Sequence, residues 1–266
     1  MSFWSRMKLL IDADYIVYKG CAAAEEEINW GKDVIMVVSN YSDAYKNVSY
    51  DLERIKSLFP FAAEMILFFS DSENFRKKIM PAYKGHRNRK KPCGYKRIIR
   101  ELSEEYKVIR MDTLEADDAL GIYATQHPGN IICSPDKDMK QIPGQLYDME
   151  QVMSVTPEEG EHMHYLQTLS GDQTDGYSGV PGMGMKRAAA WFDKHGYNWD
   201  AVVRAFIEKD LGEREALLNA RLAKILTVND YDFEQRQPIL WSPAAPSSIG
   251  VNFRAGVSVK TNSGSD

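Results

Sequence analysis

Acidic residues are densest in one short stretch, Glu115-Ala116-Asp117-Asp118, and two more acids follow at Asp136 and Asp138. Both groups lie beside apolar segments, where charged groups are costly to accommodate. Crowded carboxylates raise one another's pKa unless a cation neutralises them, and a bound divalent cation does so effectively. The pattern therefore indicates a metal-binding site. The alternative interpretation is that acids in the first turn of a helix only complement the helix dipole.

The elements that must position these acids alternate along the chain. Short apolar runs predict strands, and apolar residues at helical spacing predict helices between them. The expected strands cover residues 8–14, 34–38, 65–69, 106–110 and 130–134. The expected helices cover residues 15–24, 42–58, 114–126, 186–194, 199–206 and 214–226. This order predicts an α/β fold with a mostly parallel central sheet flanked by helices.

Three of the expected strands lead into acids at their carboxyl ends. The first ends at Asp12 and Asp14, another is followed by Asp71, and a third is followed by Asp136 and Asp138. In an open α/β sheet the carboxyl ends of parallel strands share one edge, where ligands bind. We therefore expect a shared acidic site at that edge.

Residues 76–100 are strongly basic and contain no acid. The basic residues are Arg76, Lys77, Lys78, Lys84, Arg87, Arg89, Lys90, Lys91, Lys96, Arg97 and Arg100, with Tyr83, His86 and Tyr95 between them. Such a block favours contact with phosphates, and its aromatics suit stacking on unpaired bases. The alternative is a solvated basic face of a helix. An acidic site beside a basic block indicates metal-dependent chemistry on a polyanion.

A glycine-rich segment at residues 171–187 brings two further acids, Asp172 and Asp175, ahead of a turn that enters a helix. Glycines let backbone N–H groups approach a phosphate, and a helix N-terminus favours its negative charge. The residues expected to contact phosphate here are Gly182, Gly184, Lys186 and Arg187. The alternative is that the segment is only a turn.

The composition sets limits on the class of protein. A chain of 266 residues is long enough for one large domain, or one large and one small domain. Cys21, Cys93 and Cys133 are odd in number and widely spaced, which favours a reduced, cytoplasmic protein. The sequence has no run apolar enough for a membrane span, so no membrane partner is expected. His162 and His164 have no third ligand nearby, which disfavours a zinc site.

These segments together resemble the flap-endonuclease/5′-nuclease family, and most closely the 5′–3′ DNA exonucleases of short-tailed, podovirus-type bacteriophages. The likeness is spread over residues 8–242, and its motifs occur in the same order. The matching segments are LLIDAD (9–14), FSDSENFRK (69–77), PAYKGHR (81–87), KKPCGY (90–95), LEADD (114–118), SPDKDMKQIP (134–143), GDQTDGYSGVPGMG (171–184), AKIL (223–226), NDYDF (229–233) and LW (240–241).

Two motifs depart from the family pattern. The usual Asp-Gly-x-Asn is Asp12-Ala13-Asp14-Tyr15 here, which leaves the role of Asp14 open. The usual Asp-Asn-x-x-Gly is Asp175-Gly176-Tyr177-Ser178-Gly179, which resembles the phage subgroup more than the cellular enzymes. Neither departure removes a carboxylate that is expected to hold metal.

The resemblance implies a domain arrangement and a set of site residues. It implies a PIN-like nuclease core at 7–170 with a basic helical arch at about 76–100, a helical duplex-binding region at 171–242 and a mobile tail at 243–266, after a short leader at 1–6. The implied metal-binding carboxylates are Asp12, Asp71, Glu115, Asp117, Asp118, Asp136, Asp138, Asp172 and Asp175. The implied DNA contacts are Arg76, Tyr83 (as a stacking or gating aromatic), Lys84, Arg87, Arg89, Lys90, Lys91, Gly182, Gly184, Lys186 and Arg187. The glycine-rich turn could also hold a potassium ion.

The expected mechanism is two-metal-ion hydrolysis of a phosphodiester. Oxygen-only donors favour two Mg²⁺ ions, with Mn²⁺ as a substitute. One ion would lower the pKa of a bound water, and the other would stabilise the leaving oxygen. Asp117, Asp118 and Asp136 are the expected direct ligands. Lys84 and Arg87 are expected to stabilise and steer the scissile phosphate.

Substrate and direction follow from the resemblance alone. It implies a 5′–3′ exonuclease that hydrolyses duplex DNA from 5′ ends in a host cytoplasm, with RNA of RNA–DNA hybrids as a second substrate. The alternatives are a structure-specific flap endonuclease, a non-catalytic DNA-binding scaffold and a PIN-type ribonuclease. A scaffold has no use for the clustered acids, and a small ribonuclease would not explain the basic block together with the glycine-rich turn.

Overall fold

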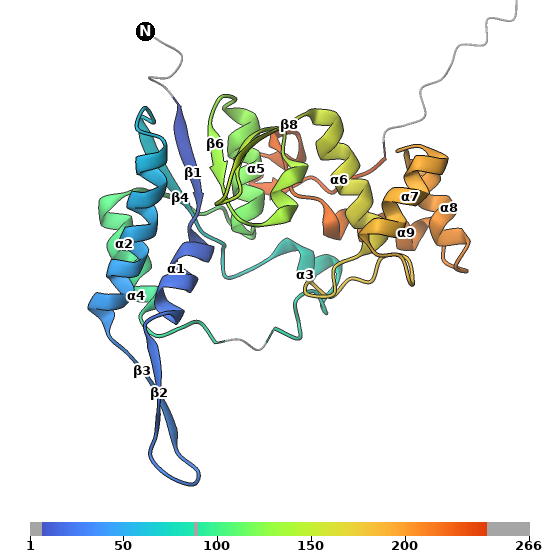
Figure 1. Ribbon diagram of the computed structural model, residues 1–266. Coiled ribbons are helices and arrows are strands. Elements are labelled where there is room, and N and C mark those ends of the chain that lie inside the picture. Colours follow the sequence, from blue (N-terminus) through green and yellow to red (C-terminus); the bar gives the residue numbers. More distant parts are fainter. Residues whose placement is uncertain (1–6, 88–89, 244–266) are drawn as a thin grey trace, which may run out of the picture.

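The computed structural model describes residues 7–87 and 90–243, and a six-stranded sheet forms the centre of this part of the chain. The strand order is β5-β4-β1-β6-β7-β8, and every neighbouring pair is parallel except β7 with β8. Helices flank the sheet (Figure 1). The predicted α/β fold with a mostly parallel sheet is therefore confirmed.

Four strands of the main sheet were predicted from the sequence, whereas its edge strands β7 and β8 were not, and the strand predicted at 34–38 lies in a separate ribbon. The strands of the main sheet are β1 (Lys8–Asp12), β4 (Glu64–Phe68), β5 (Lys107–Ile109), β6 (Ile131–Cys133), β7 (Gly144–Tyr147) and β8 (Val152–Val155). The helices are α1 (Ala13–Ala22), α2 (Tyr41–Leu58), α3 (Phe75–Ile79), α4 (Tyr95–Glu105), α5 (Ala116–Gln126), α6 (Pro157–Ser170), α7 (Met185–His195), α8 (Trp199–Ile207) and α9 (Glu213–Ala223), with short turns η2 (Lys137–Gln141) and η3 (Val228–Asp230). Two small ribbons complete the list, β2 (Glu25–Asn29) with β3 (Ile35–Ser39) and β9 (Tyr231–Asp232) with β10 (Gln237–Pro238).

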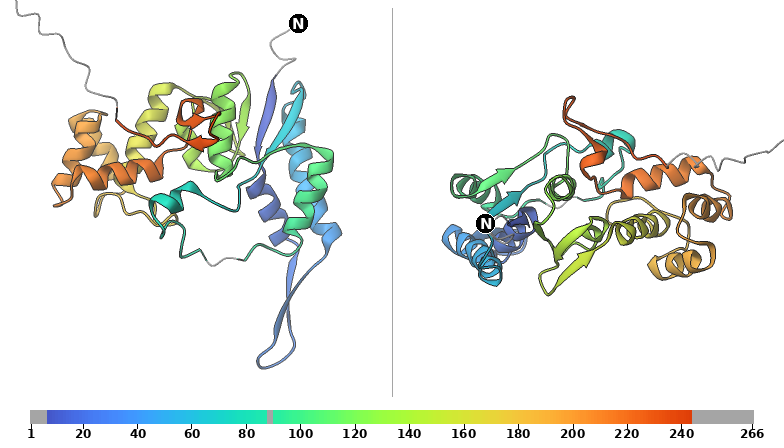
Figure 2. Two further views of the ribbon diagram at one scale, coloured as in Figure 1. Left: turned by 180° about the vertical axis from the view of Figure 1, so that it is seen from behind. Right: turned by 90° about the horizontal axis from the view of Figure 1, so that it is seen from above.

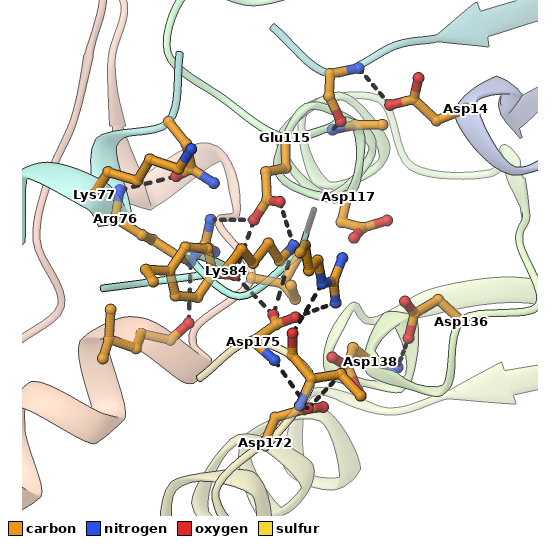
Figure 3. Close-up of a pocket in the computed structure, with 18 of the residues that line it drawn as sticks. Asp14, Arg76, Lys77, Lys84, Glu115, Asp117, Asp136, Asp138, Asp172 and Asp175 are labelled. Carbon is orange, nitrogen blue, oxygen red and sulfur yellow. Dashed lines mark hydrogen bonds and ion pairs between the residues drawn. The ribbon is translucent and has the colours of Figure 1, made fainter. Parts of the chain in front are cut away.

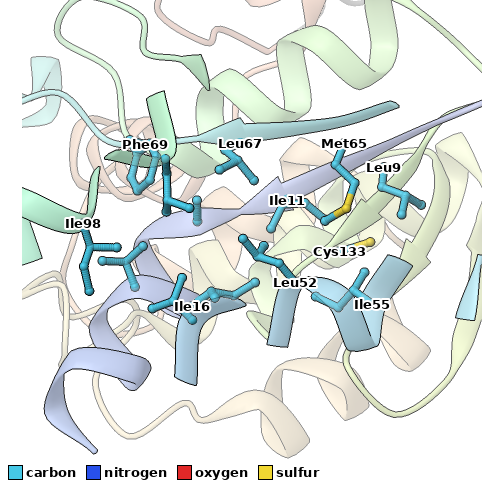
Figure 4. Close-up of a cluster of buried hydrophobic side chains, with 14 of the residues drawn as sticks. Leu9, Ile11, Ile16, Leu52, Ile55, Met65, Leu67, Phe69, Ile98 and Cys133 are labelled. Atoms are coloured by element: carbon cyan, nitrogen blue, oxygen red, sulfur yellow. The ribbon is translucent and has the colours of Figure 1, made fainter. Parts of the chain in front are cut away.

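The central strand β1 is buried on both faces of the sheet. Its Leu9 and Ile11 pack in one cluster with Ile16 of α1 and Leu52 of α2 (Figure 4). Leu10, between them, packs on the opposite face against the layer that contains α5. A strand covered on both faces reads as a continuous apolar run, which is why it was predictable. The acids at its carboxyl end are thus held between two packed layers.

Helices α1 and α5 begin two residues earlier and two residues later than predicted, and an acid occupies the N-cap position of each. Asp12 precedes α1, and its Oδ1 accepts a hydrogen bond from the Tyr15 backbone N–H at 3.3 Å. Glu115 occupies the corresponding position before α5. An N-cap residue lies outside the helical backbone conformation, so each helix starts one residue after its acid.

The region after α5 contains helical packing that the sequence revealed only in part. Helix α6 was not predicted, although α7, α8 and α9 were. Tyr165 and Leu169 of α6 pack in one cluster with Phe192 of α7 and Ala216 of α9. The domain boundary expected at 170/171 would place α6 in the nuclease core, whereas Tyr165 and Leu169 of α6 pack with the helices that follow. The expected leader at 1–6 and nearly all of the tail at 243–266 lie outside the described residues.

The described residues 80–87 and 90–94 do not form the helical arch that the family resemblance implies. Helix α3 ends at Ile79, turns follow through residue 86, and α4 begins only at Tyr95. Pro81 and Pro92 interrupt helical hydrogen bonding. The described parts of the connection from α3 to α4 lie on the side of the molecule where β1 and β4 end (Figures 1 and 2). These parts of the basic segment consist mostly of turns and not of helix.

Arg76 also differs from expectation, because it is a buried structural residue rather than a DNA contact. Its side chain is 1% exposed and forms a bidentate pair with Asp118, Nη1 donating to Oδ2 at 2.7 Å and Nη2 to Oδ1 at 2.8 Å. Its Nε donates to the Leu222 carbonyl at 3.0 Å. The pair therefore connects α3, α5 and the end of α9.

Among the helices that the structure describes, none combines the length and the apolar character that a membrane span requires.

Removing one member of this buried pair should destabilise the protein strongly. We expect Asp118→Ala to lower the free energy of unfolding by about 3–5 kcal/mol, because it leaves the Arg76 charge buried without a partner. The matched control is Glu64→Ala, which breaks a partly exposed ion pair with Lys8 and should cost less than about 1 kcal/mol. Chemical denaturation measures both. Equal stability of the two variants would show that the buried pair does not hold these elements together.

Candidate active site

Acids from neighbouring strands meet around one cavity of about 610 Å³ at the carboxyl edge of the sheet. Strands β4, β1 and β6 are adjacent, so the acids that follow them are brought together as predicted. The acids that line the cavity are Asp12, Asp14, Asp71, Glu115, Asp117, Asp136, Asp138, Asp172 and Asp175. Several of them surround the Lys84 side chain (Figure 3).

The three acids at the start of α5 point in different directions and have different partners. Glu115 accepts hydrogen bonds from Lys84 and Tyr83 and lies 3.3 Å from Arg76 Nη1. Burial opposes its charge, yet the Lys84 ammonium and the Arg76 guanidinium hold its pKa down at about 2. Asp117 faces the cavity (Figure 3). Glu115 is therefore a neutralised carboxylate, and Asp117 is the one at this helix terminus that lacks a close cation.

Asp118 must be removed from the expected direct metal ligands and catalytic residues. Its side chain is fully buried and does not line the cavity. Besides the two Arg76 hydrogen bonds, Oδ1 accepts from the Leu226 N–H at 3.2 Å and Oδ2 from the Glu115 N–H at 3.4 Å. With both oxygens engaged inside the protein, Asp118 acts as a positioning residue for Arg76 and the first turn of α5.

Lys84 and Arg87 reach the cavity from the turn after α3. Lys84 has a left-handed backbone conformation with φ of 53°, and its N–H donates to the Asp175 carbonyl at 2.8 Å. Burial opposes the charge of Lys84, but Glu115 and Asp175 raise its pKa above the ordinary value. Arg87 Nη2 lies 2.5 Å from Asp175 Oδ1, and its Nε donates to the Thr174 carbonyl at 2.8 Å. Both cations thus pair with carboxylates of the site.

Tyr83 was expected to stack on bases, and the structure corrects this expectation. The side chain is 2% exposed, and its hydroxyl donates to Glu115 Oε2 at 3.0 Å and Asp175 Oδ2 at 2.8 Å. A buried ring has no free face for a base. Tyr83 instead links α5 to the segment that carries Asp175.

Asp12, Asp117 and Asp136 form the part of the cavity with the least compensation by protein cations. Burial raises the pKa of Asp117 well above its usual range, and Asp12, Asp136 and Glu115 raise it further. Burial also raises the pKa of Asp12 to about 6, with Asp14 and Asp136 adding to the effect while the Ser134 hydroxyl, donating to Oδ2 at 2.8 Å, opposes it. These carboxylates are therefore close enough to repel one another.

Asp138 is positioned by a buried network of two amides. Gln167 Nε2 donates to Asp138 Oδ1, and Gln141 Nε2 donates to Gln167 Oε1 at 2.5 Å and to the Ala223 carbonyl at 2.7 Å. Burial raises the pKa of Asp138 to about 7, and Asp136 adds to the shift. The network orients the carboxylate without supplying a positive charge.

Asp14 and Asp71 lie in the cavity wall and are already engaged. Asp71 Oδ2 accepts from the Thr113 N–H at 2.9 Å and Oδ1 from the Ser72 N–H at 2.7 Å, and these hydrogen bonds lower its pKa. Asp14 Oδ2 accepts from the Ser70 N–H at 2.8 Å, while Oδ1 accepts from the Tyr95 hydroxyl. Asp14 therefore joins β4 to the start of α4.

Asp172 shapes the turn that presents Asp175. Its Oδ1 accepts from the Thr174 N–H at 2.7 Å and from the Asp175 N–H at 3.3 Å, and Lys137 Nζ lies 3.8 Å from its Oδ2. Asp175 then takes part in the pairs with Arg87 and Lys84. Both acids line the cavity, as expected.

The glycine-rich turn lies outside the cavity. Gly182 has φ of 76°, Gly184 directly precedes α7, and both are exposed. Lys186 and Arg187 are exposed as well, and Arg187 Nη1 donates to the Gly182 carbonyl at 2.7 Å. The turn therefore provides a separate surface with a free helix N-terminus.

The remaining basic residues are divided between the cavity and the surface. Lys91 lines the cavity, and its Nζ lies 4.4 Å from the Tyr95 ring centroid. Lys90 is exposed, and Arg89 lies outside the described residues. Tyr15 and Lys137 also line the cavity, although they were not assigned to the site. Their only signal in the sequence was adjacency, Tyr15 directly after Asp14 and Lys137 between Asp136 and Asp138.

The described side chains do not close a ligand set for a metal ion. Within residues 7–87 and 90–243, no group of three or more His, Cys, Asp or Glu side chains converges as a metal-holding set. The donor types and their unbalanced charge suit a hard divalent cation, but the carboxylates would have to turn toward one another to share it.

Comparison with known proteins identifies the family. A family model described as the 5′-3′ exonuclease, N-terminal resolvase-like domain, matches residues 7–165. The exodeoxyribonuclease of Enterobacteria phage T3 is 28% identical, over 88% of this chain and 92% of that protein. The exonuclease of Escherichia phage T7 is 27% identical, over 88% and 93%.

The fold is shared with a solved structure. The flap endonuclease of bacteriophage T5, in a complex with DNA and metal ions, superposes with a TM-score of 0.61 at 16% identity, over 83% of this chain and 89% of that one. The family model covers more than half of the chain, and the acids of the family motifs, except Asp118, line one cavity. The chain therefore belongs to the 5′–3′ exonuclease family and is a nuclease.

Proposed function

We propose that the protein is a divalent-metal-dependent 5′–3′ exodeoxyribonuclease that hydrolyses duplex DNA from 5′ ends. The observation that carries this proposal is the cavity itself. Acids from β1, β6 and α5 meet there, and Lys84 and Arg87 reach into the same space. Phosphodiester hydrolysis needs a cation-binding acidic centre beside groups that hold a phosphate.

The relatives support a DNA substrate. The T3 relative is named an exodeoxyribonuclease, and the T5 structure contains DNA and metal ions. The proposed setting is the cytoplasm of a phage host. The RNA strand of an RNA–DNA hybrid is a proposed second substrate, from the family likeness alone.

The acids of the cavity fall into those that pair with protein cations and those that do not, and this division suggests where metal would bind. Glu115 and Asp175 already pair with protein cations, whereas Asp12, Asp117, Asp136 and Asp138 line the same cavity without an ion pair among the described residues. These four are the proposed holders of Mg²⁺ or Mn²⁺, because carboxylate oxygens suit hard cations. Asp71 and Asp172 are proposed to contribute through water or position. When bound, two such ions supply an activated water and charge stabilisation.

The chain's own cations would act on the phosphate. Lys84 is proposed to leave Glu115 and bind the scissile phosphate, where its charge stabilises the developing negative charge. Arg87 is half exposed and would steer the same phosphate after leaving Asp175. The carboxylates thus keep both side chains in place until a stronger anion arrives.

The glycine-rich turn is the proposed duplex contact away from the cavity. Exposed N–H groups ahead of α7, with Lys186 and Arg187, suit a backbone phosphate. Potassium is the proposed monovalent ion there. Lys90 and Lys91 would extend the basic surface toward the cavity. Arg89, outside the described residues, stays a proposed DNA contact from the sequence.

Loss of Asp117 should abolish cleavage without abolishing DNA binding. With a 5′-labelled blunt duplex and Mg²⁺, wild type should release short 5′ products that EDTA prevents. Asp117→Ala should reduce the rate by at least about a hundredfold. The control is Glu104→Ala, an exposed acid on α4, which should cleave normally.

A 5′-flapped duplex and a hybrid with a 5′-labelled RNA strand test the substrate in the same assay. Cleavage only at the flap junction would establish the flap endonuclease instead. DNA binding without cleavage in any divalent metal would leave only a scaffold.

Lys84 should affect the chemical step more than substrate binding. We expect Lys84→Ala to lower kcat by about 10²–10³-fold, since it removes one charge that stabilises the transition state. Lys78→Ala, in the same basic segment but exposed and outside the cavity, should change kcat by less than about threefold. Single-turnover kinetics at saturating enzyme separate an effect on the chemical step from an effect on substrate binding. An unchanged single-turnover rate for Lys84→Ala would contradict the assigned role.

Metal binding should also appear as a pH-dependent gain in stability, independent of activity. The raised pKa values of Asp12 (about 6) and Asp138 (about 7) mean that the folded protein binds more protons than the unfolded chain between about pH 4 and 7. Their contribution to stability is therefore present at low pH and is lost as pH rises through 7. In EDTA, the melting temperature of wild type should fall between about pH 5 and 8, and the melting temperature of Asp138→Asn should fall less over the same range.

Added Mg²⁺ should raise the melting temperature of wild type more at about pH 8 than at pH 5, because the ion binds deprotonated carboxylates. Differential scanning fluorimetry measures these shifts. A metal-induced gain that is equal at both pH values, or equal in Asp138→Asn and wild type, would contradict metal binding by these acids.

A further inference from the structure

The β2–β3 ribbon projects away from the body of the protein (Figures 1 and 2). Its base contacts the rest of the described chain, where Glu25 accepts a hydrogen bond from the Cys93 N–H, while its outer part extends into solvent. It forms its own two-stranded sheet. An isolated two-stranded hairpin is only marginally stable in water. A long exposed ribbon of this kind is therefore expected to be stabilised by a binding partner.

The two faces of the ribbon differ in chemistry. The antiparallel register pairs Ile28 with Met36, and the Trp30 N–H donates to the Val34 carbonyl. Paired residues share a face, and faces alternate along a strand. The residues on one face, here called the apolar face, are Glu26, Ile28, Trp30, Val34, Met36 and Val38. The residues on the other face are Glu25, Glu27, Asn29, Ile35, Val37 and Ser39.

The large side chains of the apolar face are exposed to solvent. Trp30 is 69% exposed, Val34 53%, Met36 48% and Ile28 38%. None of them belongs to a hydrophobic cluster of the described residues. A contiguous apolar patch of this kind marks an interaction site.

The charge of the ribbon argues against DNA as its occupant. Glu25, Glu26, Glu27 and Asp33 oppose the single cation Lys32, so residues 25–39 carry four negative charges and one positive charge. Such a surface repels phosphates. This separates the ribbon from the basic segment at 76–100.

We propose that the apolar face binds the same face of a second copy of this chain, in an antiparallel two-fold arrangement. Two ribbons stacked face to face bury the apolar side chains of both copies and leave Glu25 and Glu27 on the outside. A two-fold interface requires such a self-complementary patch. With the base of one ribbon over the tip of the other, Glu26 of one copy meets the partner's Lys32, and symmetry repeats the pair.

The size of the ribbon predicts a weak dimer. A standard interface buries about 800 Å² on each partner, and one buried aromatic contributes about 150–250 Å². Four exposed apolar side chains on each ribbon supply roughly half of the standard area, so we expect a dissociation constant on the order of 10 µM or weaker.

Sedimentation velocity of the full chain without DNA, from about 1 to about 200 µM, tests this. The mass of wild type should rise from 30.3 kDa toward twice that value. Trp30→Ser with Met36→Ser should weaken association at least about tenfold. The matched control removes two apolar side chains from the opposite face, Ile35→Ser with Val37→Ser, and should weaken it less than about threefold.

Charge reversal tests the antiparallel arrangement. Glu26→Lys or Lys32→Glu alone should weaken the dimer about tenfold, because each substitution creates two repulsive contacts related by the two-fold axis. The double reversal should restore association. Failure of the double reversal to restore association would overturn the arrangement.

Three other results would overturn the proposal. The first is a wild-type monomer at every concentration. The second is a dimer that Trp30→Ser with Met36→Ser leaves intact. The third is a loss of affinity for duplex DNA in Trp30→Ser with Met36→Ser, but not in the opposite-face control, while wild type stays monomeric. This result would assign the apolar face to DNA.

Discussion

Mutual repulsion among carboxylates is the constraint on which the rest of the site depends. Nine acids line one cavity, and burial makes their charges costly unless a cation compensates. The protein compensates only one side of the cavity. There Arg76 and Lys84 hold the pKa of Glu115 at about 2, whereas on the other side Asp138 has a pKa of about 7. The uncompensated side is the one proposed to hold the metal ions.

The cations that compensate the other side differ in how firmly they are held. Side-chain exposure rises from 1% for Arg76 to 19% for Lys84 and 45% for Arg87. Arg76 is locked by the bidentate pair with Asp118, and a buried pair cannot exchange partners without a large cost. Lys84 and Arg87 are partly exposed, which is compatible with the partner exchange proposed for them. One short segment thus changes from buried to partly exposed as it crosses the edge of the sheet.

The sequence was sufficient for strands β1, β4, β5 and β6 and for most of the acids around the cavity, but not for β7 and β8 at the edge of the sheet. Strands buried on both faces leave a strong apolar signal, and acids at their carboxyl ends must meet once the strands are parallel. The division of labour within Glu115-Ala116-Asp117-Asp118 was not predictable. Three acids in one helical turn look equivalent in sequence, and only the position of Arg76 decides that Asp118 is buried while Asp117 faces the cavity.

Other elements were missed in the sequence because tertiary packing, and not local sequence, determines them. Glu25–Asn29 was not predicted as a strand because Glu has low strand propensity, yet pairing with Ile35–Ser39 makes it one. Helix α6 was missed because it is covered on several sides and so lacks a single apolar stripe, while its capping pair is clear in the structure, with Thr156 Oγ1 accepting from the Glu159 N–H at 3.1 Å. An aromatic residue in a basic segment looks the same in sequence whether it stacks on bases or is buried, so the burial of Tyr83 was not predictable.

The ribbon and the cavity are connected through the same basic segment. Glu25, at the base of the ribbon, accepts a hydrogen bond from the Cys93 N–H at 2.6 Å, just before α4. At the other end of that segment, Lys84 and Arg87 pair with the acids of the cavity. Association through the ribbon and phosphate binding in the cavity would therefore act on opposite ends of one connection between α3 and α4.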